Sequence, residues 1–206
     1  MTQHESVYEK NYEIYRSRIG AVDFASAAST LGLLSAGDGY KIDFFGQTYF
    51  VSQDGIQDEC GKTPDYMLCV ILAKYLILCP DQVYLDEAWC AFRDFKKESH
   101  FLNVNYFRSD TEKVIADTFS GKIDKLERIC EQLDGQKENE GFSYDLVMRF
   151  KVLPRISLLL LFNDGDDDFE AYGTVLFQKQ AEYYLDPESL AMTSAYLAQQ
   201  LRAFEK

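Results

Sequence analysis

Histidine is nearly absent from this sequence. Among 206 residues only His4 and His100 occur. A Ser/His/Asp or Cys/His mechanism would therefore depend on His100, because His4 lies in a polar N-terminal stretch. The GxSxG nucleophile elbow, the GxGxxG dinucleotide fingerprint and the P-loop are also missing. Catalysis thus has no support from a motif, and we leave open whether the protein is an enzyme.

Positive charge is scarce as well. The chain has 21 Lys and Arg residues against 34 Asp and Glu residues, which gives a net charge of −13 and a pI near 4.6. Nucleic acids and anionic membrane surfaces both require a basic footprint. The balance therefore predicts no nucleic-acid partner and no membrane-surface partner, and it fits a soluble protein or one that meets a cationic partner.

Long apolar runs are missing too. The most apolar stretch, Tyr66 to Leu78, is interrupted by Lys74 and is too short to span a bilayer. The first ten residues, MTQHESVYEK, lack the apolar segment of a secretory signal peptide. We therefore expect a cytoplasmic protein.

The five cysteines show no CxxC pair. An odd number at wide spacing predicts neither a zinc nor an iron–sulfur site, and we expect reduced thiols without disulfides. Cys69 and Cys90 lie in apolar or aromatic patterns that suit buried helices. Cys60 precedes Gly61 in a polar loop and is the thiol whose reactivity merits a test.

The strongest strand signals lie between Ser143 and Gln178. Apolar residues alternate with polar ones from Tyr144 to Val152, so Tyr144, Leu146, Met148 and Phe150 should face the core. Ile156 to Phe162 is almost wholly apolar, as in a strand buried on both faces. Gly173 to Phe177 follows as a third strand. We expect this meander to be the sheet on which the rest packs.

The remaining elements alternate between helices and one hairpin. Tyr40–Phe44 and Thr48–Val51 flank Gly46-Gln47 as a hairpin. Thr63, Pro64 and Asp65 predict an N-cap and first turn of a central helix. A helix from Asp86 should carry Trp89, Phe92 and Phe95, and the segment from His100 to Phe107 is ambiguous between strand and loop.

The second half of the chain gives four more predictions. Ser109 and Glu112 form a capping box, a helix covers 123–133, and residues 135–141 are a mobile connection. Asp186-Pro187 opens the last helix, which has four apolar residues on one side: Leu190, Leu197, Leu201 and Phe204.

These elements predict an α+β fold in a single domain over residues 1–206, with residues 1–35 an N-terminal helical segment. A mixed or mainly antiparallel sheet should pack against several helices. The N-terminal helix and the helix from Pro64 should be its main packing partners.

Aspartates crowd the turn between the second and third strands of the meander. Asp164, Asp166, Asp168 and Glu170 offer the oxygen ligands that Ca²⁺ or Mg²⁺ prefers. The EF-hand pattern fails, because Phe169 stands where it needs glycine. The alternative, which we favour, is a solvated turn whose charge protects the sheet from edge pairing.

Two further features could bind a ligand. Trp89 and Arg93 lie four residues apart, so on a helix they would line one surface with a cation over the indole. The alternative, which we favour, is core packing with the arginine reaching solvent. Arg155 could bind an anion or, as we favour, pair with an aspartate of the acidic turn.

Several motifs resemble the DUF3786 domain family of anaerobic prokaryotes. They are Asp43–Tyr49 (DFFGQTY), Trp89–Arg93 (WCAFR), Pro154-Arg-Ile-Ser-Leu, Asp166–Phe169, Leu176-Phe177 and Tyr184-Leu185. The family pattern differs at Asp168, usually Glu, at Glu170, usually Pro, and at Gln178, usually Asp. The resemblance implies no established activity and no known cofactor. Some family members carry an added iron–sulfur module that this chain lacks, which implies a metallocofactor-related context.

Together these observations predict a non-catalytic binding or accessory protein, in an anaerobic metallocofactor-related pathway if the family context holds. A small molecule or another protein would be its partner. One alternative is a carboxylate-dependent metal enzyme that uses the acidic turn. The other is an acidic protein-interaction subunit.

Overall fold

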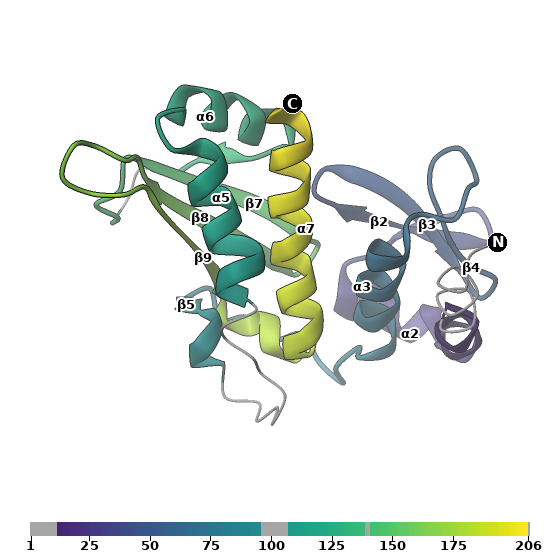
Figure 1. Cartoon of the computed structure of the whole chain (residues 1–206). Coiled ribbons are helices and arrows are strands. Elements are labelled where there is room, and N and C mark those ends of the chain that lie inside the picture. Colours follow the sequence, from purple (N-terminus) through teal and green to yellow (C-terminus); the bar gives the residue numbers. More distant parts are fainter. Residues whose placement is uncertain (1–11, 96–106, 139–140, 206) are drawn as a thin grey trace.

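The computed structural model describes residues 12–95, 107–138 and 141–205, with only the backbone described at 108 and 109. It contains two antiparallel sheets, one of four strands and one of five, with helices packed beside both (Figure 1). The predicted α+β fold is confirmed, and its antiparallel pairing is divided between two sheets.

The four-stranded sheet is a meander in the order β1 (Leu34–Ala36), β2 (Gly39–Phe44), β3 (Gln47–Ser52) and β4 (Gly55–Gln57). The predicted hairpin is β2–β3. Its turn residues are Phe45 and Gly46, one position earlier than expected. Their φ angles are 48° and 73°. Positive φ at both positions is the geometry of a type I′ turn, whose twist matches that of the flanking strands.

Helices cover this sheet. Residues 12–19 are helical, and α2 (Phe24–Leu31) and α3 (Tyr66–Ile77) follow. Helix α3 is buried on nearly all sides, as predicted, because apolar side chains occupy almost every position. Its N-cap is Asp65, whose carboxylate accepts from the Leu68 N–H at 3.0 Å. The predicted start at Thr63 is therefore two residues too early.

The five-stranded sheet has the order β5 (Trp89–Ala91), β9 (Tyr172–Gln178), β8 (Ile156–Asn163), β7 (Leu146–Leu153) and β6 (Gln136–Lys137). The predicted meander is confirmed as β7–β8–β9. Leu146, Met148 and Phe150 are buried in the main core. Tyr144 is an exception to the prediction. It precedes the first residue of β7, so the strand's alternation does not reach it, and it packs on the opposite face.

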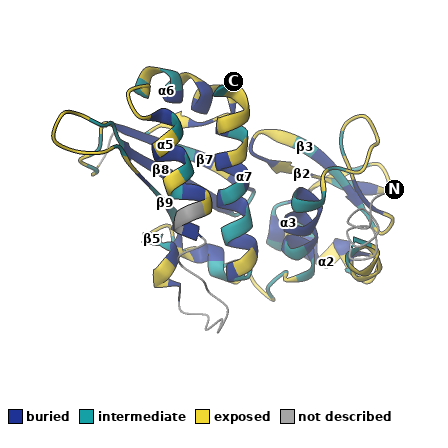
Figure 2. Ribbon diagram, in the orientation of Figure 1, coloured by how far each residue is buried: buried dark blue, intermediate teal, exposed yellow. Residues whose placement is uncertain are grey.

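Helices lie on one face of this sheet: α5 (Lys113–Phe119), which continues η2 (Arg108–Glu112), then α6 (Ile123–Gln132) and α7 (Pro187–Glu205) (Figure 1). The expectation that the N-terminal helix and α3 would cover the meander is wrong, because α3 contacts β4 and α7 instead. Figure 2 shows the strands largely buried and the outward sides of the helices exposed.

Phe45, at the β2–β3 turn, joins the two sheets through its backbone and its ring. The Phe45 N–H donates to the Val152 carbonyl at 3.2 Å. Its ring lies 5.9 Å from the ring of Phe150 and 5.9 Å from that of Tyr196 on α7. One contiguous apolar core therefore includes residues of both sheets.

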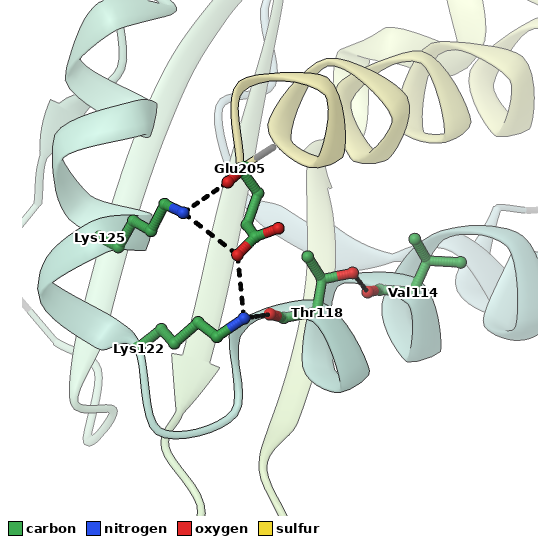
Figure 3. A network of polar contacts seen from close by, with 5 residues as sticks. All are labelled: Val114, Thr118, Lys122, Lys125 and Glu205. Atoms are coloured by element: carbon green, nitrogen blue, oxygen red, sulfur yellow. Dashed lines mark hydrogen bonds and ion pairs between the residues drawn. The ribbon is translucent and has the colours of Figure 1, made fainter.

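Lysines fix the end of α7 against α6 and the turn before it. Lys122 Nζ lies 2.9 Å and Lys125 Nζ 3.1 Å from Glu205 Oε1 (Figure 3). Lys125 Nζ also donates to the Glu205 carbonyl. Cations at a helix C-terminus complement its partial negative charge. The two lysines thus stabilise the last turn of α7.

Several local predictions need correction. Trp89–Ala91 is the edge strand β5, followed by the 3-10 turn η1 (Phe92–Asp94), and not a helix. Residues 136–137 of the predicted mobile connection pair with β7. Phe204 is 51% exposed, whereas the other three marker residues of α7 are buried.

The capping box at Ser109 lies outside the described side chains. Its partner Glu112 instead accepts from Thr174 Oγ1 at 2.5 Å and from the Val175 N–H at 3.3 Å, which binds η2 to β9. The ambiguous segment before Phe107 lies outside the described residues. In the part of the chain that is described, no helix is both long enough and apolar enough to span a bilayer.

Candidate functional site

The two residues expected to share a helical surface are separated. Trp89 lies on β5 and pairs with Gln178 of β9. Arg93 lies in η1 with 75% of its side chain exposed, and its nearest ion pair is Asp94, at 3.8 Å. The cation over the Trp89 ring is Arg149 of β7, with its Cζ 5.8 Å from the ring centroid. The hypothesis that Arg93 lies over the Trp89 ring is wrong, and Arg149 makes the cation–π contact instead.

Arg155 lies at the β7–β8 turn and does not pair with the acidic turn, which is at the other end of β8. Its Nε donates to the Thr30 carbonyl at 2.9 Å, and its Nη2 donates to the Ser29 carbonyl at 2.8 Å. These carbonyls belong to the last turn of α2, where a cation complements the helix dipole. The predicted pairing with an aspartate is therefore wrong.

Arg149 and Arg155 line a cavity of about 420 Å³ on the face of the five-stranded sheet opposite α5 and α7. We name it the sheet-face groove. Its lining residues come from β6 to β9, from the β7–β8 turn and from the segments before β5, β6 and α7: Leu85, Glu87, Asp134, Gln136, Arg149, Lys151, Pro154, Arg155, Ile156, Ser157, Gln178 and Gln180.

Strand register explains why these side chains converge. Lys151 pairs with Ser157, and Gln178 pairs with Trp89. Ser157 stands one position beyond the last β8–β9 pair, Leu158 with Phe177, so it lies beside Gln178. Directly opposed residues of an antiparallel ladder share a face at about 5 Å. Lys151, Ser157, Gln178 and Trp89 therefore form one row across four strands.

Two buried glutamines shape the floor of the groove. Gln178 Oε1 accepts from the Ser157 N–H at 3.2 Å and from Gln180 Nε2 at 3.4 Å. Gln180 Nε2 also donates to the Arg155 carbonyl at 2.8 Å, and its Oε1 accepts from the Asp86 N–H at 2.8 Å. These side-chain hydrogen bonds take the place of backbone hydrogen bonds between β8 and β9 at the point where the two strands stop pairing. They fix both amides in one orientation.

Several polar donors in the groove have no protein partner. Ser157 is only 7% exposed and Gln178 only 3%. Yet among the described residues the Ser157 hydroxyl and the Gln178 NH₂ group make no hydrogen bond. Among the described residues, Thr111 Oγ1 is the buried side-chain atom without a partner, so the Ser157 hydroxyl and the Gln178 NH₂ group reach the solvent of the groove. A molecule bound in the groove can supply acceptors to these two donors.

Charge in the groove contrasts with the acidic chain. Arg149, Lys151 and Arg155 line it, and no described carboxylate lies within 4.0 Å of any of them. Glu87 and Asp134 also line the cavity, and both are exposed, as is Lys151. Guanidinium, ammonium, hydroxyl and amide groups are all donors. This arrangement suits a ligand that offers acceptors.

The acidic turn uses its carboxylates locally. Asp164 Oδ1 accepts from the Gly121 N–H at 2.6 Å and from the Gly165 N–H at 2.8 Å. Asp166 Oδ1 accepts from the N–H groups of Asp168 and Phe169, both at 2.8 Å. Within the described residues, no group of three or more His, Cys, Asp or Glu side chains is placed to hold a metal ion.

The tip of the same turn carries exposed aromatic rings beside the acids Asp168 and Glu170. Phe169 is 74% exposed and Tyr172 is 47% exposed. The loop that carries Phe169 projects from the sheet, and its residues 166–170 are exposed, whereas Tyr172 is the first residue of β9 (Figure 2). An interaction subunit was expected to show an exposed apolar patch with a charged rim. Phe169 is an exposed apolar side chain beside charged residues, while Leu34 and Leu85 are exposed elsewhere.

The five cysteines are free. Cys60 is exposed, as expected for its loop. Burial raises the pKa of the Cys69 thiol to about 12 and that of the Cys90 thiol to about 11. Burial also raises the pKa of Cys130. Low thiolate content makes these three poor nucleophiles.

Sequence reasoning found Arg155 and Trp89 but missed Arg149, Lys151 and Gln178. Arg149 and Lys151 could have been found from the polar face of β7, where they alternate with buried residues. Gln178 gave no such signal, because its role depends on where β8 stops pairing with β9.

Comparison with known proteins gives one match. The family model described as "Domain of unknown function (DUF3786)" matches residues 23–200. The searches of curated proteins and of solved structures found no match. The matched region contains both sheets and every residue of the sheet-face groove. The chain therefore belongs to the DUF3786 family.

Proposed function

We propose that this protein is a non-catalytic binding protein that holds a small molecule in the sheet-face groove. The observation that carries the proposal is a pair of donors, the Ser157 hydroxyl and the Gln178 NH₂ group, that line the groove and lack protein partners among the described residues. A cavity of about 420 Å³ is within the size range of small-molecule sites.

The lining of the groove favours binding over catalysis. It includes no histidine and no cysteine. Its carboxylates, on Glu87 and Asp134, are exposed and make no ion pair with the lysine and arginines of the groove. A general base must be within hydrogen-bond reach of the proton it removes. A binding or accessory role requires only the donors that are present.

Native mass spectrometry of protein purified under anaerobic conditions tests the proposal. We expect the wild-type chain to retain a low-mass ligand and the Ser157→Leu variant to lose it, since leucine fills the floor of the groove. Thr30→Leu is the matched control, because Thr30 lines a separate cavity of about 460 Å³ between α2 and α3. Retention in Ser157→Leu, or loss only in Thr30→Leu, would place the ligand elsewhere.

A further inference from the structure

We infer that the ligand of the sheet-face groove is an oxyanion, a carboxylate or a phosphate ester, held on the row Lys151–Ser157–Gln178 with Arg149 beside it. This inference rests on the proposed function and names the class of ligand. It follows from the kind of groups that meet in the groove and from how each is held.

Donors without acceptors define the head-group position. Lys151 supplies an ammonium group, Ser157 a hydroxyl and Gln178 an NH₂ group, from three adjacent strands. None of these groups has a partner among the described residues. A neutral ligand with one acceptor would leave some of them unsatisfied. An oxyanion has two or three acceptor oxygens and can satisfy them together.

The orientation of Gln178 is fixed by the protein. Its Oε1 accepts from the Ser157 N–H, so the amide must present its NH₂ group on the other side. The site therefore does not need to reorganise when an anion binds. Preorganised donors in a partly buried site bind charge more strongly than mobile surface groups do.

Arg149 is held in place in a similar way. The face of Trp89 supports its guanidinium at 5.8 Å. In register, Arg149 faces Leu159, and Leu159 faces Leu176, so this second row is apolar on β8 and β9 and polar at Arg149 and at Gln136 of β6. At the rim, Leu85 is 71% exposed. An anion with an apolar portion would satisfy both the row of donors and this rim.

A set of three probes tests the ligand class: benzoate, phenyl phosphate and the neutral isostere benzamide. Backbone amide shifts are followed by NMR in a buffer without phosphate. We expect one or both anions to shift amides around Arg149, Lys151, Ser157 and Gln178. Benzamide should bind about tenfold or more weakly, because it lacks the charge-assisted hydrogen bonds. The stronger of the two anions identifies the head group.

Two variants and a matched control complete the test. Lys151→Met should weaken binding of the anion about tenfold or more, as should Gln178→Glu, which keeps the acceptor for the Ser157 N–H and adds a negative charge. Lys137→Met makes the same charge change on the other face of the same sheet, where Lys137 pairs with Glu127 at 2.9 Å, and should leave affinity unchanged.

The outcomes separate the two proposals. If benzamide binds the groove as well as the anions do, or if Lys151→Met has no effect, the oxyanion assignment is wrong while binding in the groove stands. If an anion shifts amides only outside the groove, or if millimolar probes shift none, the oxyanion assignment is also overturned. Native mass spectrometry then decides separately whether any ligand occupies the groove.

Discussion

At the scale of single residues, the role of Arg155 is to cap α2. Its two hydrogen bonds join the β7–β8 turn to a helix far away in the sequence. We expect Arg155→Met to lower the free energy of unfolding by about 1–2 kcal/mol, since charge-assisted bonds to the Ser29 and Thr30 carbonyls are lost. Urea denaturation measures this. Arg93→Met, at an arginine that is 75% exposed, should change it by less than about 0.5 kcal/mol. Equal losses would contradict the capping role.

Asp186 gives a pH dependence at the same scale. Burial alone would raise its pKa, but hydrogen bonds from Lys74 Nζ at 2.7 Å and from the Ser189 N–H outweigh burial and lower the pKa below the ordinary 3.8. A carboxyl group with a lowered native pKa contributes stability that is present above its unfolded value. That contribution is lost as the pH falls through the native pKa.

Asp186→Asn should therefore destabilise the protein at neutral pH, and its deficit should shrink as the pH falls below 3.8. Asparagine can still cap α7, so the ion pair with Lys74 is the interaction removed. Asp65→Asn is the matched control, because Asp65 caps α3 through the Leu68 N–H. Denaturant midpoints measured across this pH range provide the test. A deficit at Asp186 that does not depend on pH would refute it.

At the scale of elements, β5 shows that pairing with the edge of a sheet can outweigh a helical pattern in the sequence. Trp89, Phe92 and Phe95 have helical spacing, yet Trp89–Ala91 pairs with β9. The free edge of β9 supplies backbone partners, and Trp89 reaches a cluster on the outer face. Pairing and burial together outweigh a weak helical preference.

The acidic turn is the second element with a testable role. We expect Ca²⁺ to give the same small shift in melting temperature in wild type and in the Asp166→Asn, Asp168→Asn double variant. Asparagine keeps the Oδ1 acceptor that Asp166 offers to two backbone N–H groups. The variant should be as stable as wild type or slightly more stable, because like charges no longer repel.

Thermal melts with Ca²⁺ and calorimetric titration measure this response. A bound cation would raise stability by RT ln(1 + [L]/Kd). A saturable Ca²⁺ isotherm that disappears in the double variant would show a metal site at the turn and would favour the metal-enzyme alternative.

At the scale of the whole molecule, Phe45 connects two sheets that each have their own helices. Its burial beside Phe150 and Tyr196 makes the core continuous. We expect the wild-type chain to unfold in a single calorimetric transition, as predicted for one domain. Phe45→Ala should lower stability by about 3–5 kcal/mol or split the transition. Phe204→Ala, at a ring that is 51% exposed, is the control and should leave one transition near the wild-type temperature. Two transitions in wild type would show two domains.

Local sequence signals were sufficient to predict the strands of the meander, the β2–β3 hairpin, α3 and the start of α7. In each case the signal is local: alternation in β7, an unbroken apolar run in β8, glycine at a turn that needs positive φ, and an aspartate before a helix. Such signals act through the residue's own backbone and its near neighbours, so one sequence is enough to read them.

Tertiary structure alone decided the position of Arg155, the pairing of Trp89 with Arg149, and the row Lys151–Ser157–Gln178. Each depends on which strands become neighbours and on the register between them. A shift of one residue would turn Lys151 to the helix-covered face. The site is therefore a property of strand pairing. It forms where residues far apart in the sequence are brought to one face of the sheet by the burial of their neighbours on the other.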